Sequence, residues 1–454
     1  MTRPVVVIDI VGLTPALLVH MPRVAAVGRE GFRAELGTIL PAVTCSQQST
    51  FLTGTLPRDH GIVGNGWLFR ELSEIWLWRQ SNRLVTGEKI WEAASRMLGR
   101  PIKCANLFWW YAMGSTADIA VTPRPVYHAD GRKAPGVYAH PAAVGDDLVK
   151  HLGGFPLFDF WGPRAGLPAS AWIANAARRV FDRERPDLTL VYLPHLDYDL
   201  QRHGGRGAHA VAAAAEIDAV AADLIDHVRE GGATVIVLSE YGITDVGRPV
   251  HVNRRLREAG LLEIVRNDAG GLLDAFASRA LSVADHQVAH LYARDPAALA
   301  AAREVLQDLP GIAEILDDDG KRAAGLDHSR AGDLVLVADA DAWFTYYYWL
   351  DERDAPDFAP TVEIHRKPGY DPAELFFADG KAKARAVLRL AQKALGFRYV
   401  MDVVPLDGDR VRGSHGRLPT SPDDGPVLMC TDARLGRDRF DATDVFGLML
   451  DALR

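Results

Sequence analysis

The hydrophobic residues of this chain fall into short β-branched runs separated by longer segments with helical spacing. Residues 5–10, 188–193 and 233–238 are almost continuously apolar. Such runs indicate strands that are buried on both faces, as in parallel sheets. Between them, residues 88–97 have the spacing of an amphipathic helix, and residues 210–228 form an alanine-rich helical segment. This alternation predicts an α/β fold with a mostly parallel, doubly wound sheet flanked by helices.

The alternation breaks in two places. The Pro- and Gly-rich region 123–168 has little periodicity, and we expect it to be mostly loop. After residue 253, the segments 289–293 and 333–338 read as strands, but an alanine-rich helix and a charged loop separate them. This second break predicts an inserted α+β cap. The expected division is a first part of the catalytic core at 1–253, a cap or accessory lobe at 254–390, and a return to the core at 391–454.

Composition narrows the functional class. Hydrophobic residues make up 48% of the 454 residues and charged residues 24%, which is typical of a soluble globular protein with a large core. The net charge of -8 argues against binding to a nucleic acid polymer or an anionic membrane. The first strand follows directly on residues 1–4, and no apolar run approaches 20 residues, about the length that a transmembrane helix needs. We therefore expect a cytoplasmic protein with no membrane partner.

Carboxylates and imidazoles follow three of the predicted strands. Asp9 ends the first strand, and Glu240 and Tyr241 follow the strand at 233–238. The loop after 188–193 contains a further group, and one histidine lies late in the chain between two glycines: His195, Asp197, Asp199, His203 and His415. Open α/β sheets place their ligands at the carboxyl ends of strands. These side chains suit a divalent metal of the zinc, manganese or iron type.

The segment 41–54 adds a candidate nucleophile. Thr44 stands just ahead of a helix start, where free N–H groups and the helix dipole favour an anion such as a phosphoryl oxygen. A threonine hydroxyl is a weak nucleophile at neutral pH and needs a base or a metal to activate it. Taken alone, a threonine at this place is more often an N-cap hydroxyl than a nucleophile. Together with the metal-type residues, it points to catalysis.

The order of these residues resembles that of the alkaline phosphatase superfamily, most closely its nucleotide pyrophosphatase/phosphodiesterase (type I phosphodiesterase) branch. Thr44 matches a Pro-x-x-Thr nucleophile segment that Thr53-Gly54 closes, and residues 60–65 match a His-Gly-Ile-Val-x-Asn stretch. The pair Asp199 and His203 fits an Asp-x-x-x-His motif, and His415 fits the last ligand. The matches extend from residue 9 to residue 416.

This resemblance implies a metal-dependent phosphoric ester hydrolase that forms a covalent phospho-threonine on Thr44. It also implies that Asn65 hydrogen-bonds a phosphoryl oxygen and that two divalent metal ions, with zinc as the first expectation, hold the reacting groups. Two ligand sets are implied: Asp9, Thr44 and Glu240 for one ion, and Asp199 or Asp197, His203 and His415 for the other. The substrate would be a small phosphoester, pyrophosphate or phosphonate.

Two features of the ligand set depart from the family or stay ambiguous. The family has Ser-Asp-His-Gly where this chain has Ser239-Glu240-Tyr241-Gly242. A phenol has an unperturbed pKa of about 10, so Tyr241 binds a metal only if a strongly acidic ion, such as iron or manganese, removes its proton. Otherwise another residue fills the position, and the candidates are His195, His251, Asp285 and His286. Spacing to His203 favours Asp199 as the loop ligand, and distance from the strand end favours Asp197; we prefer Asp199.

Other residues are candidates for substrate contact. Trp67 either packs as a core or pocket wall or stacks on a flat leaving group. His365 and Lys367 lie in a turn-rich cap segment, where they either face solvent or reach a charged group of the substrate. Three alternative functions share the motifs: a phosphonate hydrolase, a phosphoryl transferase of the mutase kind, and a non-catalytic binding protein with a degenerate second metal site. The oligomeric state is left open.

Overall fold

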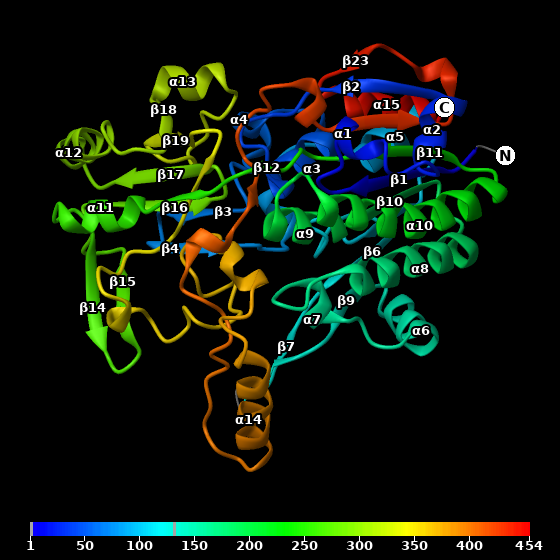
Figure 1. Ribbon diagram of the computed structural model, residues 1–454. Helices are drawn as coiled ribbons and strands as arrows, with labels where there is room; N and C mark the ends of the chain where they lie inside the picture. The colour runs from blue at the N-terminus through cyan, green and yellow to red at the C-terminus, as the bar shows by residue number, and fades with distance from the viewer. Residues whose placement is uncertain (1–2, 130–132) are drawn as a thin grey trace.

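The computed structural model describes residues 3–129 and 133–454, and its centre is a nine-stranded sheet (Figure 1). Parallel neighbours dominate: β1 lies between β10 and β11, and β5 and β6 continue the parallel series. On one side of this parallel series β22 pairs with β11 in antiparallel orientation, and on the other side β9 pairs with β6 in the same way. In sheet order the strands are β23 (Arg439–Phe440), β2 (Phe32–Leu36), β22 (Val427–Cys430), β11 (Thr234–Leu238), β1 (Val5–Ile10), β10 (Leu188–Leu193), β5 (Cys104–Leu107), β6 (Ile119–Pro123) and β9 (Val137–His140).

Helices cover both faces of this sheet (Figure 1). On one face, α8 (Leu167–Glu184) packs on β10 and α10 (Ala208–Glu230) packs on β11. On the other face lie α3 (Thr44–Thr53), α5 (Ile90–Leu98) and α15 (Asp444–Ala452), with α15 in contact with both α3 and α5. Every residue of β1, β10 and β11 is buried, as continuous apolar runs require. The predicted doubly wound, mostly parallel α/β core is confirmed.

The prediction of loop for residues 123–168 is wrong. This region contains α6 (Ala142–Leu152), α7 (Leu157–Phe160), the edge strand β9 and the short strands β7 (Val126–Tyr127) and β8 (Lys133–Ala134). Helix α6 packs on β9 and α8 through the buried Leu148. Few apolar positions are needed for this edge contact, so the periodicity is weak. Part of the predicted loop, residues 130–132, lies outside the described residues.

A smaller lobe is built on a four-stranded antiparallel sheet with the order β16-β17-β19-β18. Its apolar core also takes in Ile62, Val63 and Trp67 from the first part of the chain. Its elements are α11 (Val252–Glu258), β14 (Glu263–Asn267), β15 (Gly270–Asp274), β16 (Ala280–Asp285), β17 (Val288–Ala293), α12 (Pro296–Leu306), β18 (Ile312–Leu316), α13 (Asp318–Ala323) and β19 (Leu334–Ala338). The predicted boundaries stay a prediction, and α14 (Ala382–Ala394) spans the one at 390/391.

Short elements connect the two parts. The hairpin of β3 and β4 packs against β16, and β13 pairs with β20. No helix of the described residues has both the length and the apolar character needed to cross a bilayer. The remaining elements are α1 (Pro15–Leu18), α2 (Ala25–Glu30), α4 (Pro57–His60), β3 (Gly66–Phe69), β4 (Glu74–Leu77), α9 (His195–His203), β12 (Thr244–Asp245), β13 (Arg248–Val250), β20 (Ala342–Phe344) and β21 (Gly413–Ser414).

A buried ion cluster organises the segment that follows the smaller lobe. Lys367 is 1% exposed, and its Nζ lies 2.7 Å from Asp371 and 2.8 Å from Glu374. Glu374 also accepts a hydrogen bond from the Trp161 indole next to α7. A buried lysine between two carboxylates keeps its charge, and burial without them would be costly. The cluster therefore joins residues 367–374 to the main domain.

The central strand provides a direct test of the fold. Ile8 is 0% exposed in β1, so Ile8→Ala opens a cavity beside the central sheet where β1 lies between β10 and β11. We expect a loss of about 2–5 kcal/mol in the free energy of unfolding, measured by denaturant titration with tryptophan fluorescence. Val19→Ala, at a site that is 74% exposed, is the matched control and should change it by less than about 0.5 kcal/mol. Equal effects would contradict the placement of β1.

Removal of the buried cation should also destabilise the chain. Lys367→Met leaves Asp371 and Glu374 as two buried carboxylates without a cation. We expect a loss of about 3–5 kcal/mol in the free energy of unfolding. The exposed Lys150→Met serves as the control in the same denaturant titration. A Lys367→Met protein as stable as the wild type would show that the cluster does not stabilise the segment.

Candidate active site

Three segments that are far apart in the sequence meet at the carboxyl edge of the central sheet. Thr44 is the first residue of α3, and its Oγ1 lies 2.9 Å from Glu240 Oε2 and 2.8 Å from Tyr241 Oη. Asp9 lies near the end of the neighbouring strand, in register with Leu238 of β11. All four side chains are buried. The structure thus brings together the predicted nucleophile and one predicted ligand set.

Helix α3 positions two of these groups at once. Gln48, one turn after Thr44, donates from Nε2 to Asp9 Oδ2 at 3.2 Å and accepts at Oε1 from the Trp110 backbone N–H at 2.8 Å. All residues of α3 are buried although most are polar. Their hydroxyls bond to carbonyls one turn back, as those of Ser49 and Thr50 do. Buried polar groups need such partners, so the helix is rigidly held.

Two carboxylates face each other beside Thr44. Burial raises the pKa of Asp9, and burial together with the charge of Asp9 raises the pKa of Glu240 well above its usual value. Within the described residues, Asp9 Oδ1 and Glu240 Oε1 are buried without a hydrogen-bond partner. Two buried carboxylates in contact repel unless a proton or a cation lies between them. Their arrangement fits a cation.

A second group of polar side chains lies next to the first. Asp197 Oδ2 accepts from Gln201 Nε2 at 2.8 Å, and Asp197 Oδ1 lies 3.8 Å from His415 Nε2. That separation is too long for a hydrogen bond, but two donors of one ion at metal–ligand distances of about 2.0–2.2 Å lie a similar distance apart. Burial raises the pKa of Asp197 to about 7, and its Oδ1 has no hydrogen-bond partner among the described groups.

Loop geometry holds His415 in place. Strand β21 pairs with β12, which brings the loop at 413–416 beside Tyr241. The His415 Nδ1–H donates to the Ala42 carbonyl at 2.8 Å, so Nε2 is left to face Asp197. Its ring stacks on Tyr241 with centroids 3.7 Å apart. Gly416 has a φ of +121°, which favours glycine, and a Cβ there would crowd the backbone N of Gln287.

Asp199 and His203 lie on another side of α9. Asp199 pairs with Arg202 at 2.9 Å, and the exposed His203 stacks on His209. Residues two apart on a helix point in nearly opposite directions, so Asp197 and Asp199 cannot both face the site. This geometry favours Asp197 over Asp199, the reverse of the preference that the spacing suggested. His195, on the same side as Asp199, lies 3.0 Å from Glu216 of α10.

Asn65 is fixed by hydrogen bonds from both lobes. Its Oδ1 accepts from the Cys45 N–H at 3.0 Å, and its Nδ2 donates to Asp285 Oδ1 at 3.0 Å. Asp285 also accepts from the Asn65 backbone N–H and lies 2.8 Å from His286 Nδ1. The centroid of the His286 ring lies 3.8 Å from that of His415. Asp285 and His286 therefore reach the site from the turn between β16 and β17 and support Asn65 and His415.

The other candidates for substrate contact interact with residues other than Thr44 and its hydrogen-bond partners. Burial lowers the pKa of His365 to about 4, helped by the charges of Lys133 and Arg79. The remaining three are engaged elsewhere: Trp67 stacks on Phe69, His251 bonds to Thr345 Oγ1, and Lys367 pairs with Asp371 and Glu374. None of these contacts involves Thr44 or its hydrogen-bond partners.

Sequence reasoning did not find Gln48, Gln201 or Tyr370. The Tyr370 hydroxyl donates to Gln201 Oε1 at 2.7 Å, and its ring stacks on His286. A signal for Gln201 was present, because Asp197-x-x-x-Gln201 has the spacing of the family's Asp-x-x-x-His motif. With this alignment, the chain has glutamine as well as tyrosine where the family has histidine. The described residues contain no group of three or more His, Cys, Asp or Glu that could hold a metal ion.

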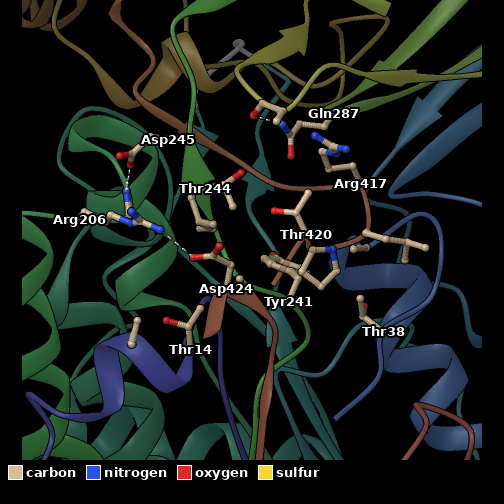
Figure 2. Close-up of a pocket in the computed structure, with 18 of the residues that line it drawn as sticks. Thr14, Thr38, Arg206, Tyr241, Thr244, Asp245, Gln287, Arg417, Thr420 and Asp424 are labelled. Atoms are coloured by element: carbon tan, nitrogen blue, oxygen red, sulfur yellow. Dashed lines mark hydrogen bonds and ion pairs between the residues drawn. The ribbon is translucent and has the colours of Figure 1, made fainter. Parts of the chain in front are cut away.

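A cavity of about 300 Å³ opens beside Tyr241 (Figure 2). In the close-up, Tyr241 and Asp424 lie near its centre, with Arg417 and Gln287 on one side and Arg206 on the other. Arg206 pairs with Asp424 at 3.3 Å. Tyr241 lines this cavity and its Oη contacts Thr44 Oγ1, whereas the Thr44 side chain itself is not part of the lining. The cavity therefore lies next to the site, with Tyr241 shared between the two.

The chain matches a protein-family model and several solved structures. The family model for type I phosphodiesterase/nucleotide pyrophosphatase matches residues 5–371. No curated protein sequence matches the chain. Among solved structures, phosphonoacetate hydrolase from Sinorhizobium meliloti 1021, in complex with phosphonoformate, is 14% identical with a TM-score of 0.60, covering 100% of this chain and 96% of that one.

Murine and human ectonucleotide pyrophosphatase/phosphodiesterase 5 are also similar. The murine protein, as an inactive variant in complex with AMP, is 14% identical with a TM-score of 0.58, and the human protein is 13% identical with a TM-score of 0.59. Both comparisons cover 99% of this chain and 95% of the other. At such identity, these structures show the shared fold. The family model extends over most of the chain, which therefore belongs to the type I phosphodiesterase/nucleotide pyrophosphatase family of hydrolases, within the alkaline phosphatase superfamily.

Proposed function

We propose that this chain hydrolyses a phosphoric ester or anhydride bond of a small molecule through a covalent phospho-threonine on Thr44. One observation carries the proposal: the Thr44 hydroxyl lies 2.9 Å from Glu240 and 2.8 Å from Tyr241, at the start of α3. A hydroxyl held against a buried carboxylate at a helix start is placed both to lose a proton and to meet an anion.

The donor sets support two cation positions of different character. Asp9, Thr44, Glu240 and Tyr241 offer oxygen alone, which suits a hard ion such as manganese, magnesium or iron better than zinc. Asp197 and His415 would serve the second position, with Gln201 where the family has histidine. A bound divalent cation would lower the pKa of the threonine hydroxyl and offset the negative charge of the phosphoryl group. The partnerless atoms of Asp9, Glu240 and Asp197 support this assignment.

Thr44, Glu240 and Asn65 have different roles in the proposed reaction. Thr44 Oγ1 attacks phosphorus while its proton passes to Glu240 Oε2, and the bond to the leaving oxygen breaks with its electron pair. Asn65 is held by Cys45 N and Asp285, and the second hydrogen of its amide is free to meet a phosphoryl oxygen. The oxygen of a water molecule then bonds to phosphorus, the bond from phosphorus to Thr44 Oγ1 breaks, and the proton held by Glu240 returns to Oγ1, which regenerates Thr44.

The nature of the substrate is inferred from the size of the opening and from the relatives. A cavity of about 300 Å³ fits a small molecule. The structural relatives were solved with phosphonoformate and with AMP, so phosphonates and nucleotide esters are the substrates to test first. A second candidate is a binding protein without turnover. Tyr241 and Gln201 favour it, because they replace two histidine ligands of the family and weaken the metal site.

The nucleophile is tested by Thr44→Ala. We expect hydrolysis of bis-p-nitrophenyl phosphate and p-nitrophenyl phosphate to fall by at least about a thousandfold, with the far-UV circular dichroism unchanged. Thr44→Ser keeps a hydroxyl and should retain measurable turnover. Acid-quenched wild type should carry a phosphoryl group on Thr44 by mass spectrometry. A Thr44→Ala protein near wild-type activity would exclude this mechanism, and absence of turnover in the wild type with every metal would favour the binding protein.

Metal binding separates the proposed ligands from their neighbours. Titration calorimetry of metal-depleted protein with manganese should show about two ions per chain. Asp197→Asn should weaken manganese binding by at least about tenfold. Asp199→Asn, on the opposite side of α9, is the matched control and should change it little. Gln201→His should raise zinc affinity, because it restores a nitrogen ligand. A loss confined to Asp199→Asn would reverse the assignment.

A further inference from the structure

Helix α14 (Ala382–Ala394) projects from the body of the molecule as an arm (Figure 1). Of its thirteen residues only Ala382 is buried. The chain leaves the body after Asp379, runs out along the helix and returns through residues 397–402. We call residues 381–400 the arm. Neither the proposed nucleophile nor its hydrogen-bond partners lie in the arm, so a role of the arm is independent of the proposed function.

The face of α14 turned towards the protein is charged. Arg385 donates from Nε to the Asp402 carbonyl at 2.9 Å, and Arg389 donates from Nε to the Asp402 carboxylate at 2.9 Å. Arg385 also pairs with Asp379 at 3.1 Å. Ala386, on the same side of the helix, packs on the small apolar cluster with Val404. The arm is therefore attached to the protein mainly through its arginines.

The opposite face is apolar and open to solvent. The spacing of residues 387, 388, 391 and 395 places them on one side of a helix. Large apolar side chains are exposed along the arm: Val387 (67%), Leu388 (58%), Leu390 (52%), Leu395 (74%) and Phe397 (65%). A helix of a soluble protein normally turns this face to the core. A continuous exposed apolar face of this kind marks an interaction site.

The arm is basic, although the chain as a whole is acidic. Residues 380–401 contain six basic residues and no Asp or Glu: Lys381, Lys383, Arg385, Arg389, Lys393 and Arg398. The whole chain carries a net charge of -8. Two of the arginines are used in the ion pairs with Asp379 and Asp402. Lys381 and Lys383 flank the apolar face, where long side chains reach past an apolar layer to a polar one, whereas Lys393 lies over the Tyr399 ring.

Two occupants of this face can be compared. A second copy of the chain would have to offer an apolar patch, but the other exposed large apolar side chains of the described residues are scattered over separate elements, such as Val19, Met97 and Phe276. Arm-to-arm pairing would bring two basic segments together, which like charges oppose. A bilayer with anionic lipids accepts both the apolar face and the basic residues. Charge complementarity therefore favours the bilayer.

We propose that the arm is a membrane-surface anchor that lays Val387, Leu388 and Leu395 into the headgroup boundary of an anionic bilayer. Lys381, Lys383 and Arg398 contact the lipid phosphates, and the body of the protein stays in water. This local excess of basic residues is not apparent from the net charge of the whole chain, which is negative. The binding is peripheral and reversible, because it uses one short helix and no lipid modification.

Vesicle sedimentation of the full chain tests the anchor. Wild type should co-sediment with vesicles of phosphatidylglycerol and phosphatidylcholine, and at least about tenfold less with vesicles of phosphatidylcholine alone. The double variant Leu388→Glu/Leu395→Glu should lose at least about tenfold of the binding. The matched control is Val19→Glu/Phe276→Glu, at exposed apolar positions outside the arm, which should bind as the wild type does. Circular dichroism checks that each variant folds.

Charge and assembly are tested in the same preparation. Lys381→Glu/Lys383→Glu should weaken binding to the anionic vesicles, and added salt should weaken wild-type binding. Light scattering coupled to gel filtration reports the oligomeric state without lipid. If the wild type does not bind the anionic vesicles, the proposal is wrong. If the wild type is then a dimer and Leu388→Glu/Leu395→Glu is a monomer, the arm binds a second copy of the chain. Equal vesicle binding by wild type and this variant also overturns it.

Discussion

The crowding of buried carboxylates at one edge of the central sheet governs the rest of the structure. Asp9, Glu240 and Asp197 lie at the ends of three neighbouring parallel strands, and no folded protein keeps three such charges in an apolar interior without compensation. Gln48 donates to Asp9 and Gln201 to Asp197, and each of the three carboxylates still keeps an oxygen without a partner among the residues that the structure describes. The sheet thus places buried carboxylate oxygens, which need a proton or a cation, at the point where the Thr44 hydroxyl lies.

The surrounding architecture fixes the side chains at this edge through hydrogen bonds and ring contacts. Helix α3 is buried along its length, and the smaller lobe reaches the site through Asp285, which fixes Asn65, and through His286. Tyr370, on the segment fastened by Lys367, stacks on His286 and bonds to Gln201. The two lobes are therefore coupled through the site itself. Reacting groups held in this way need little rearrangement when a phosphoryl group arrives.

The site differs from the family pattern in a consistent direction. Tyrosine and glutamine stand where two histidines are expected, and neither side chain offers the ring nitrogen lone pair of a histidine ligand. Both are also tied into the surroundings, Tyr241 to Thr44 and the His415 ring, and Gln201 to Asp197 and Tyr370. The consequence is a donor set with fewer nitrogen ligands, which suits ions that prefer oxygen. A shared fold is thus compatible with a changed choice of metal.

By itself, the sequence determined the α/β core, because buried parallel strands must be continuously apolar, and it determined the residues that leave those strands: Asp9, Glu240 and, through the order of the motifs, Thr44 and His415. The edge helix α6 escaped detection because its edge contact demands few apolar positions. Tertiary structure alone decided between Asp197 and Asp199, since two residues on one helix face opposite ways and spacing cannot say which way the helix is turned. It also decided that the apolar face of α14 points outward, because helical periodicity shows that a face exists and only packing shows where it is directed.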